Sequence, residues 1–231
     1  LPRRVSMLRL ATVLTLLGCW ISCGESSPDA SLDTAMTMSV AGSSSADIWN
    51  GQCSACHGAA GEGVRALGGP ALTQLSAEYL ARQLTHFVTG IRGTHPDDNA
   101  GKRMALSVAN LSEDDIAGLA TLITTELPPA QPTSTIAGDA ARGEDYYINL
   151  CSACHGGNAL GNDLLGAPAL AGVSDWYLKS SYQGYLEGTR GHHPDDTYGA
   201  QMARLAPALA RGGDINDVIA YIATLPPRRA P

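Results

Sequence analysis

The chain has 231 residues, and its formal net charge at pH 7 is −7. This acidic balance argues against nucleic acid or an anionic lipid surface as the partner, and it favours a partner with a lysine-rich docking face. The length permits two small domains, although aromatic residues make up only 5% of the chain, which is few for hydrophobic cores of the usual kind.

The N-terminus has the form of an export signal. Three arginines precede a short apolar run over 10–17, and this run is too short to cross a bilayer. It ends in Leu-Leu-Gly followed by Cys19, which resembles the lipobox of bacterial lipoproteins. We therefore expect residues 1–18 to be removed and Cys19 to carry lipid, and loss of the three arginines takes the net charge from −7 to −10. The alternative is an ordinary cleaved signal, with Cys19 and Cys23 paired or free.

Residues 19–45 are rich in Ser, Ala, Thr and Asp and have no apolar period. This composition predicts a flexible tether. It leads into a short helix expected over 47–56.

That helix ends in the pentapeptide Cys-Ser-Ala-Cys-His, which occurs at 53–57 and again at 151–155. Cys-x-x-Cys-His is the attachment signature of c-type haem, in which the two thiols form thioethers and the histidine binds the iron. A zinc half-site or a redox dithiol also uses Cys-x-x-Cys, but neither requires the histidine. The pattern predicts two covalent haems, attached through Cys53, Cys56, Cys151 and Cys154 and ligated by His57 and His155.

The pentapeptides belong to an internal repeat of 98 residues. The same shift superimposes Pro70 on Pro168, Tyr79 on Tyr177, Arg92 on Arg190 and Met104 on Met202. A proline-rich stretch separates the copies. We therefore expect one domain over 46–127, a linker over 128–137 and a second domain over 138–227.

The apolar periods inside each copy are helical. In the first copy, Ser76 and Ser112 are expected to cap helices. Ser174 opens the matching helix of the second copy, and a longer segment over 139–154 leads into the second pentapeptide. No run alternates as a strand does, so the predicted fold class is all-α: two tandem domains, each wrapped around one haem, with glycine-rich connections over 58–69 and 156–167.

The sixth iron ligand decides between electron transfer and chemistry on a bound substrate. Met104 and Met202 each stand 47 residues after a motif histidine, in segments read as loops before the last helix of each copy. We expect them to be the distal ligands. The alternatives are His95 and His193, which occupy matching His-Pro-Asp-Asp turns and would give bis-histidine iron. His86, like His192, has no matching histidine in the other copy and is interpreted as a surface residue.

This order of motifs resembles the class I c-type cytochromes twice over, and as a whole the dihaem cytochrome c4 kind. The resemblance covers about 46–227. It implies that Pro70 and Pro168 offer backbone carbonyls to the haem histidines, and that Arg92 and Arg190 contact haem propionates. The His-Pro-Asp-Asp turns are not part of the general pattern.

The resemblance implies a periplasmic protein that carries single electrons to or from an oxidase, a reductase or a dehydrogenase. The main alternative is an electron-accepting subunit of one dehydrogenase complex. A dihaem enzyme, such as a peroxidase or a thiosulfate dehydrogenase, would need an open or weakly held iron, and a haem sensor would need a five-coordinate iron and an output domain. Six-coordinate iron predicts an electron-transfer protein and no enzyme.

Overall fold

The computed structural model describes residues 43–131, 133–210 and 214–228. The predicted signal over 1–18, Cys19 and nearly all of the tether lie outside these residues. The described part is helical, and its only bridges are two isolated pairs, Val64 with Gly69 and Asn162 with Ala167. The predicted all-α fold is confirmed.

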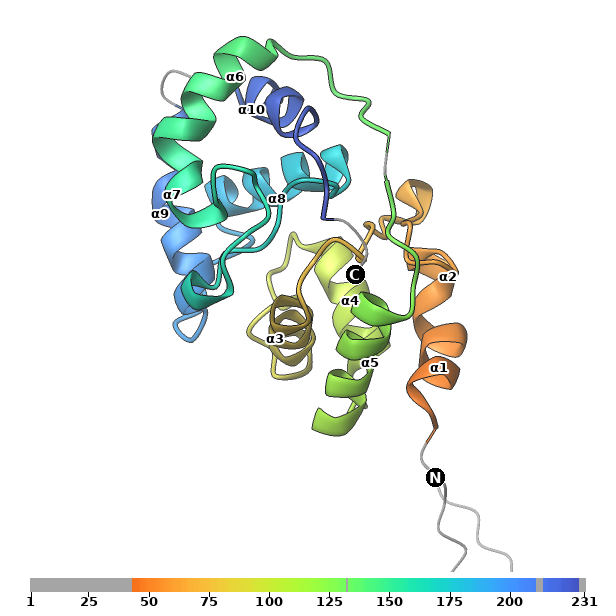
Figure 1. The fold of residues 1–231 in the computed structure, drawn as a ribbon. Helices are drawn as coiled ribbons and strands as arrows, with labels where there is room; N and C mark the ends of the chain where they lie inside the picture. Colours follow the sequence, from red (N-terminus) through yellow and green to blue (C-terminus); the bar gives the residue numbers. More distant parts are fainter. Residues whose placement is uncertain (1–42, 132, 211–213, 229–231) are drawn as a thin grey trace, which may run out of the picture. The chain divides into compact units, whose positions relative to one another are not determined.

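Each domain repeats one order of elements (Figure 1). The first domain contains α1 (Ser45–Ile48), the π-helical η1 (Trp49–Cys53), α2 (Ser54–His57), the short η2 (Arg65–Leu67), α3 (Ala77–Val88), α4 (Asn99–Val108) and α5 (Glu113–Thr125). The second contains α6 (Ala140–Tyr146), the π-helical η3 (Tyr147–Cys151), α7 (Ser152–His155), η4 (Asp163–Leu165), α8 (Asp175–Glu187), α9 (Thr197–Ala210) and α10 (Ile215–Ile222).

Side-chain caps set where several helices begin. Ser112 and Asp115 form a capping box at α5, and the Ser76 hydroxyl accepts a hydrogen bond from the backbone N–H of Tyr79 at α3. Such caps satisfy backbone donors that a helix start leaves unpaired. Ser174 also stands before its helix, but its hydroxyl accepts from the backbone N–H of Ala71 in the other domain. Ser76 also donates to Asp163 Oδ1 of the second domain at 2.5 Å, so both serines join the domains, but only Ser76 caps its own helix.

Two hydrophobic clusters form the cores. In the first domain α3 packs on α5, and in the second α6 packs on α10. The first cluster includes buried Trp49, Leu119 and Ile123, and the second is built around Tyr147 and Val218. The motif cysteines Cys53 and Cys151 pack against the first and second cluster respectively.

The segment between the domains is held by hydrogen bonds. The backbone of Ala130 donates to Thr73 Oγ1 at 2.7 Å and accepts from Gln74 Nε2 at 2.9 Å. Further along, Asp175 at the start of α8 accepts from the backbone N–H groups of Thr135 and Ile136. These bonds hold the pKa of Asp175 below its usual value although burial alone would raise it.

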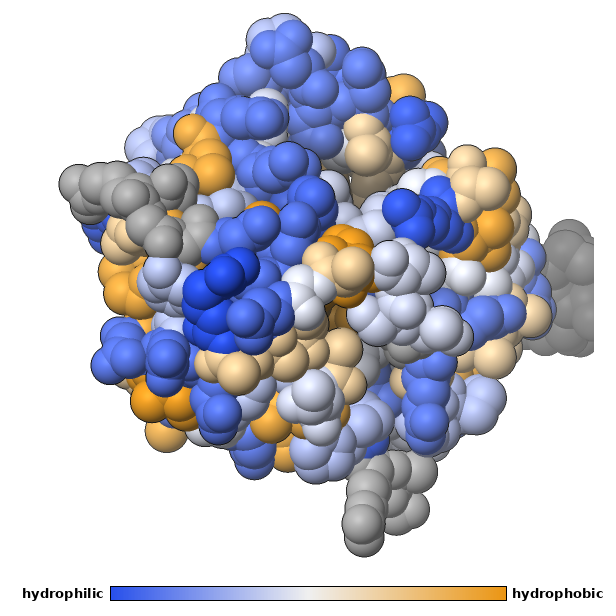
Figure 2. Space-filling view, turned by 90° about the horizontal axis from the view of Figure 1, so that it is seen from above, coloured by the Kyte–Doolittle hydropathy of each residue, from blue (hydrophilic) through white to orange (hydrophobic). Residues whose placement is uncertain are grey.

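The face drawn in Figure 2 is mostly hydrophilic, with small hydrophobic groups scattered across it. Among the described residues, no helix combines the length and the apolar character that crossing a membrane requires.

Candidate functional site

A π turn precedes each pentapeptide and ends at its first cysteine. The elements η1 and η3 end at Cys53 and Cys151, and the following α2 and α7 each carry the remaining motif residues. Single π turns occur often at functional sites. The wide turn in each domain rests on a buried aromatic residue: Trp49 Nε1 donates to the carbonyl of Ala59, and the Tyr147 hydroxyl donates to the carbonyl of Gly156.

Both motif histidines have one ring nitrogen held by a backbone carbonyl. His57 Nδ1 lies 2.9 Å from the carbonyl oxygen of Pro70, and His155 Nδ1 lies 2.8 Å from that of Pro168. Burial lowers the pKa of both imidazoles, and these hydrogen bonds offset only part of that effect. A neutral imidazole that donates through Nδ1 keeps the lone pair of Nε2 available for a metal.

A glycine with positive φ brings each proline segment against its histidine. The N–H of Gly63 donates to the carbonyl of His57, and the N–H of Gly161 donates to the carbonyl of His155. These glycines have φ of +87° and +81°, and an added Cβ would lie 2.5 and 2.6 Å from the backbone N of the residue after the proline. Only glycine meets both conditions at low cost.

The expectation that Met104 and Met202 lie in loops was wrong. Met104 lies within α4 and Met202 within α9. The reason is the Asp-Asp pair before each segment: Asp98 Oδ1 accepts from the N–H of Gly101 at 2.7 Å, and Asp196 Oδ1 accepts from the N–H of Gly199 at 2.9 Å. An aspartate in this position begins a helix.

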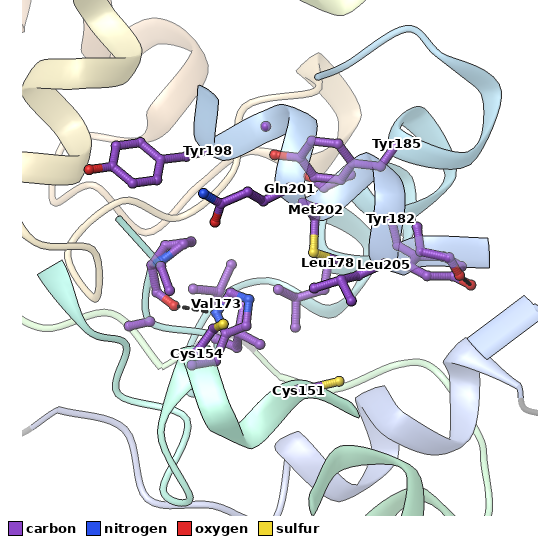
Figure 3. A pocket seen from close by; sticks show the side chains of 18 of the residues that line it. Cys151, Cys154, Val173, Leu178, Tyr182, Tyr185, Tyr198, Gln201, Met202 and Leu205 are labelled. Carbon is purple, nitrogen blue, oxygen red and sulfur yellow. Dashed lines mark hydrogen bonds between the residues drawn. The ribbon is translucent and has the colours of Figure 1, made fainter. Parts of the chain in front are cut away.

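In the second domain the motif and the methionine line one cavity of about 180 Å³, which is far more space than a single water molecule needs. Cys151, Cys154 and His155 lie on the wall formed by η3 and α7, and the sulfur of Met202 points into the cavity from α9 (Figure 3). In the first domain Met104 packs against the core cluster that also contacts Cys53.

The rival histidines face their own turns. The N–H of Asp97 donates to His95 Nδ1, and the N–H of Asp195 donates to His193 Nδ1, each at 3.2 Å. His192 packs edge-on against His95, with ring centroids 5.2 Å apart. The interpretation of His86 as a surface residue was wrong, because His86 is buried at the contact with the second domain.

The two repeated arginines lie near the contact between the domains. Arg92 donates to Gln83 Oε1 at 2.7 Å and to the Tyr177 hydroxyl of the other domain at 3.2 Å, while its Nε is buried without a hydrogen-bond partner. Arg190 lines the cavity, where Tyr79 of the first domain also reaches it. The structure gives neither guanidinium a carboxylate partner within the described residues. Partly buried cations of this kind fit an anionic group such as a haem propionate.

The surroundings of Cys53 and Cys151 do not favour a reactive dithiol. Burial, followed by the neighbouring motif cysteine, raises the pKa of Cys53 and of Cys151 to about 11. A reactive dithiol needs the opposite shift. No cluster of three or more His, Cys, Asp or Glu suited to a metal ion occurs in the described part of the chain. An apolar cavity with two thiols, an imidazole and a thioether fits a covalent haem c.

Sequence reasoning missed three features: the π turn before each motif, the contribution of α3 to the second cavity, and the burial of His86. A signal existed for the first, since Trp49 and Tyr147 occupy matching positions 98 residues apart. The other two depend on how one domain meets the other, and the pattern of a single copy carries no such information.

The family model for cytochrome c matches residues 44–125 and 140–226. Among curated proteins, the chain is similar to thiosulfate dehydrogenase electron acceptors from Thiomonas intermedia (33% identical; 62% of this chain and 66% of the relative) and Stutzerimonas stutzeri (32% identical; 75% and 78%). It is also similar to a cytochrome c4 of Stutzerimonas stutzeri, with 28% identity over 74% of this chain and 82% of the relative.

Solved structures show the same fold. The cytochrome c4 of Acidithiobacillus ferrooxidans aligns with a TM-score of 0.58 at 23% identity, over 75% of this chain and 98% of that one. The thiosulfate dehydrogenase TsdBA from Marichromatium purpuratum aligns with a TM-score of 0.56 at 30% identity, over 75% of this chain but only 36% of the other. The chain therefore belongs to the cytochrome c family, as a cytochrome c4-like protein with two cytochrome c domains in tandem.

Proposed function

We propose that this chain is a dihaem electron carrier, with one haem c in each domain. Cys53 and Cys56 would attach the first haem, with His57 and Met104 on the iron. Bound haem would supply a centre that exchanges one electron at a time. In the second domain the attachment residues would be Cys151 and Cys154, and the axial ligands His155 and Met202.

The observation that carries this proposal is the second cavity, where two motif cysteines and a carbonyl-held histidine lie across from a methionine sulfur (Figure 3). A histidine and a methionine together fill both axial positions of a haem iron, which favours electron transfer over reaction with a substrate. Leu165 and Leu205 line the same cavity and are 45% and 48% exposed. They would give a redox partner an apolar approach to the cofactor edge.

Arg92 and Arg190 are proposed to hold propionates. The buried, unpaired Nε of Arg92 and the position of Arg190 in the cavity wall support this role. Pro70 and Pro168 would orient the axial histidines through the carbonyl contacts described above.

The test is expression in a bacterium that attaches c-type haem, followed by intact mass measurement and haem staining of a denaturing gel. The proposal predicts a mass increase of two haems and a low-spin spectrum. A protein that retains one haem, or that binds zinc at the motifs instead, would overturn it.

A more specific role is electron acceptor of a dehydrogenase that oxidises thiosulfate. Similarity to two proteins named thiosulfate dehydrogenase electron acceptors favours it over a general carrier. A purified thiosulfate dehydrogenase and thiosulfate should reduce both haems without oxygen, faster than they reduce a single-domain c-type cytochrome of similar potential. Equal rates with the two cytochromes would leave only the general role.

The proposed location is the periplasm, because c-type haem is attached outside the bacterial cytoplasm and residues 1–18 have the form of an export signal. Attachment to a membrane through lipid on Cys19 remains a prediction. Fractionation checks it: a lipidated protein should stay with membranes through a high-salt wash and be released by detergent, whereas Cys19→Ala should be soluble and keep its haem.

A further inference from the structure

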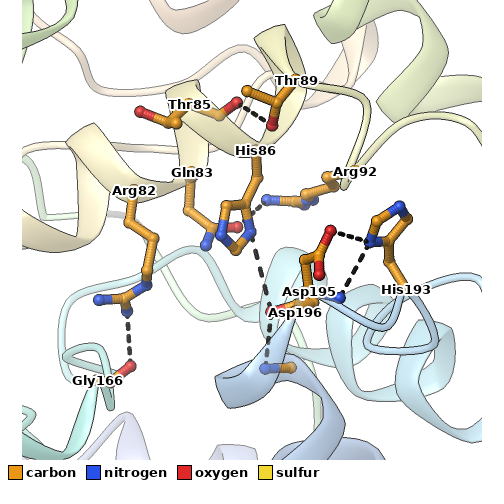
Figure 4. Close-up of polar contacts among 11 residues, drawn as sticks. Arg82, Gln83, Thr85, His86, Thr89, Arg92, Gly166, His193, Asp195 and Asp196 are labelled. Carbon is orange, nitrogen blue, oxygen red and sulfur yellow. Dashed lines mark hydrogen bonds and ion pairs between the residues drawn. The ribbon is translucent and has the colours of Figure 1, made fainter.

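Helix α3 of the first domain contacts the start of α9, the helix that carries Met202 in the second domain. Two side chains of α3, one turn apart, make the contact, and Figure 4 shows their polar contacts with Gly166 and Asp196. The guanidinium of Arg82 lies 4.7 Å from the ring centroid of Tyr198 and donates to the Gly166 carbonyl at 2.7 Å. His86 Nδ1 lies 3.9 Å from Asp196 Oδ1.

The Asp196 oxygen that faces His86 also begins α9. Oδ1 accepts a hydrogen bond from the N–H of Gly199 at 2.9 Å, and the Asp196 carbonyl accepts from the N–H of Ala200 at 2.8 Å. Met202 follows in the next turn of the same helix. A protonated His86 would therefore attract the Asp196 carboxylate, which fixes the start of α9, the helix that carries Met202.

The first domain lacks this arrangement. Asp98 caps α4 in the same way, with a distance of 2.7 Å to the N–H of Gly101. However, the residue 98 positions after His86 is Gly184, and the residue 98 positions before Tyr198 is Ala100. The duplication thus keeps the aspartate cap in both domains but places a titratable group from the neighbouring domain against only one of them.

The His86 imidazole is buried among charged groups. Its side chain is 11% exposed and that of Asp196 is 13% exposed, and His86 Nδ1 has no hydrogen-bond partner. Arg82 and Arg92 face it from its own domain, and Asp196 and His193 face it from the other. Burial lowers the pKa of His86 below its usual value, Asp196 opposes this effect, and the two arginines add to it.

A lowered pKa fixes the direction of the pH effect. At pH values above the ordinary pKa near 6.5, His86 is neutral, and it meets Asp196 as an uncharged imidazole. As the pH falls through the lowered pKa, the His86 imidazole gains a positive charge. This charge lies beside Arg82 and Asp196, which both line the cavity of the second domain. A positive charge near a haem favours the reduced iron, because reduction removes one positive charge.

We propose that His86 is a positioning residue for the second haem centre, acting through Asp196 and the start of α9, and that protonation of His86 changes the reduction potential of this centre and not of the first. The inference rests on the proposed function, in which Met202 is an axial ligand. It assigns a role to one of the two His-Pro-Asp-Asp turns, which the general cytochrome pattern does not contain.

The test is a redox titration of the dihaem protein at several pH values between about 5 and 8, across the usual range of histidine. One of the two potentials should become more positive as the pH falls, while the other stays constant. His86→Gln should abolish the slope of this potential against pH, because glutamine cannot take up the proton. His95→Gln, on the turn of the first domain, should retain it.

A second pair of variants guards against misfolding of His86→Gln. Asp196→Asn keeps an oxygen to cap α9 but removes the charge that favours the proton on His86, so the slope should disappear from this pH range. Asp98→Asn makes the same change at α4 and should leave the slope in place. The inference is overturned if both potentials move together with pH, or if the slope persists in His86→Gln.

Assignment of the potentials separates this inference from the proposed function. A second imidazole on the iron lowers the potential relative to a thioether, so Met202→His should lower the pH-sensitive potential and Met104→His the constant one. If neither variant lowers a potential, the proposed ligands are wrong. If each lowers its own potential but the slope belongs to the first centre, only the role of His86 fails.

Discussion

His155 Nδ1 lies 2.8 Å from the carbonyl oxygen of Pro168, and a glycine makes this approach possible. Gly161 donates its N–H to the His155 carbonyl and passes against the backbone of Ala169 at a positive φ. The histidine is therefore fixed from two sides by backbone groups. The backbone contacts that set its ring orientation do not involve α9.

Replacing Gly161 by alanine tests whether this glycine is needed for the close approach to the backbone of Ala169. The new Cβ would meet backbone atoms at 2.6 Å in a conformation that alanine rarely adopts, and strain of this kind costs about 1–3 kcal/mol. The free energy of unfolding, measured in guanidinium chloride, should fall by at least that amount. Gly157→Ala is the control, since nothing lies within 4 Å of its added Cβ. Equal losses for the two variants would show that the tight loop does not depend on Gly161.

The cap on α4 should be measurable as a stability contribution. Asp98→Ala removes the oxygen that accepts from the N–H of Gly101, and loss of an N-terminal cap costs about 1 kcal/mol. Chemical unfolding should report this loss, and Asp97→Ala, whose side chain is 83% exposed, should change little. A larger effect from Asp97→Ala would contradict the assignment of the cap.

The second domain should lose stability in acid through Asp217. Its carboxylate accepts from Arg142 Nε at 2.5 Å and from the N–H of Asp139 at 2.7 Å, and these contacts lower its pKa. A lowered carboxyl pKa gives stability that is present above the ordinary value, about 4, and is lost as the pH falls through the lowered one.

Unfolding measured against pH should therefore show a smaller acid dependence in Asp217→Asn, together with lower stability at neutral pH. Asp195→Asn changes a carboxylate that is 75% exposed and should follow the unmodified protein. An unchanged acid dependence in Asp217→Asn would assign the effect to other carboxylates.

Much of the fold could be predicted because short-range patterns determine it. The repeat predicted two domains, the helical periods predicted the all-α class that the structure confirms, and Ser76 and Ser112 cap helices as their positions suggested. The methionine segments were misread as loops because the Pro-Asp-Asp sequence resembles a turn. In the structure its second aspartate instead starts a helix at the next residue.

The contact between the domains could not be predicted in this way. His86 has no matching histidine at the same position of the other copy, and the packing of α3 against the second domain buries it. Likewise, Ser174 has the sequence position of a helix cap, but its hydroxyl accepts no hydrogen bond from its own helix start and accepts instead from the backbone N–H of Ala71 in the other domain. Such roles depend on which surfaces meet, and local sequence does not encode them.

The most direct measurement of the central claim is the weak far-red absorption band of an iron–methionine sulfur bond in the oxidised dihaem protein. With Met104 and Met202 as the two distal ligands, either single Met→Ala variant should halve the intensity of this band, and the double variant should abolish it while both haems stay attached. If the methionine variants keep the band in full, or if His95→Ala or His193→Ala removes it, the proposed iron ligands are wrong.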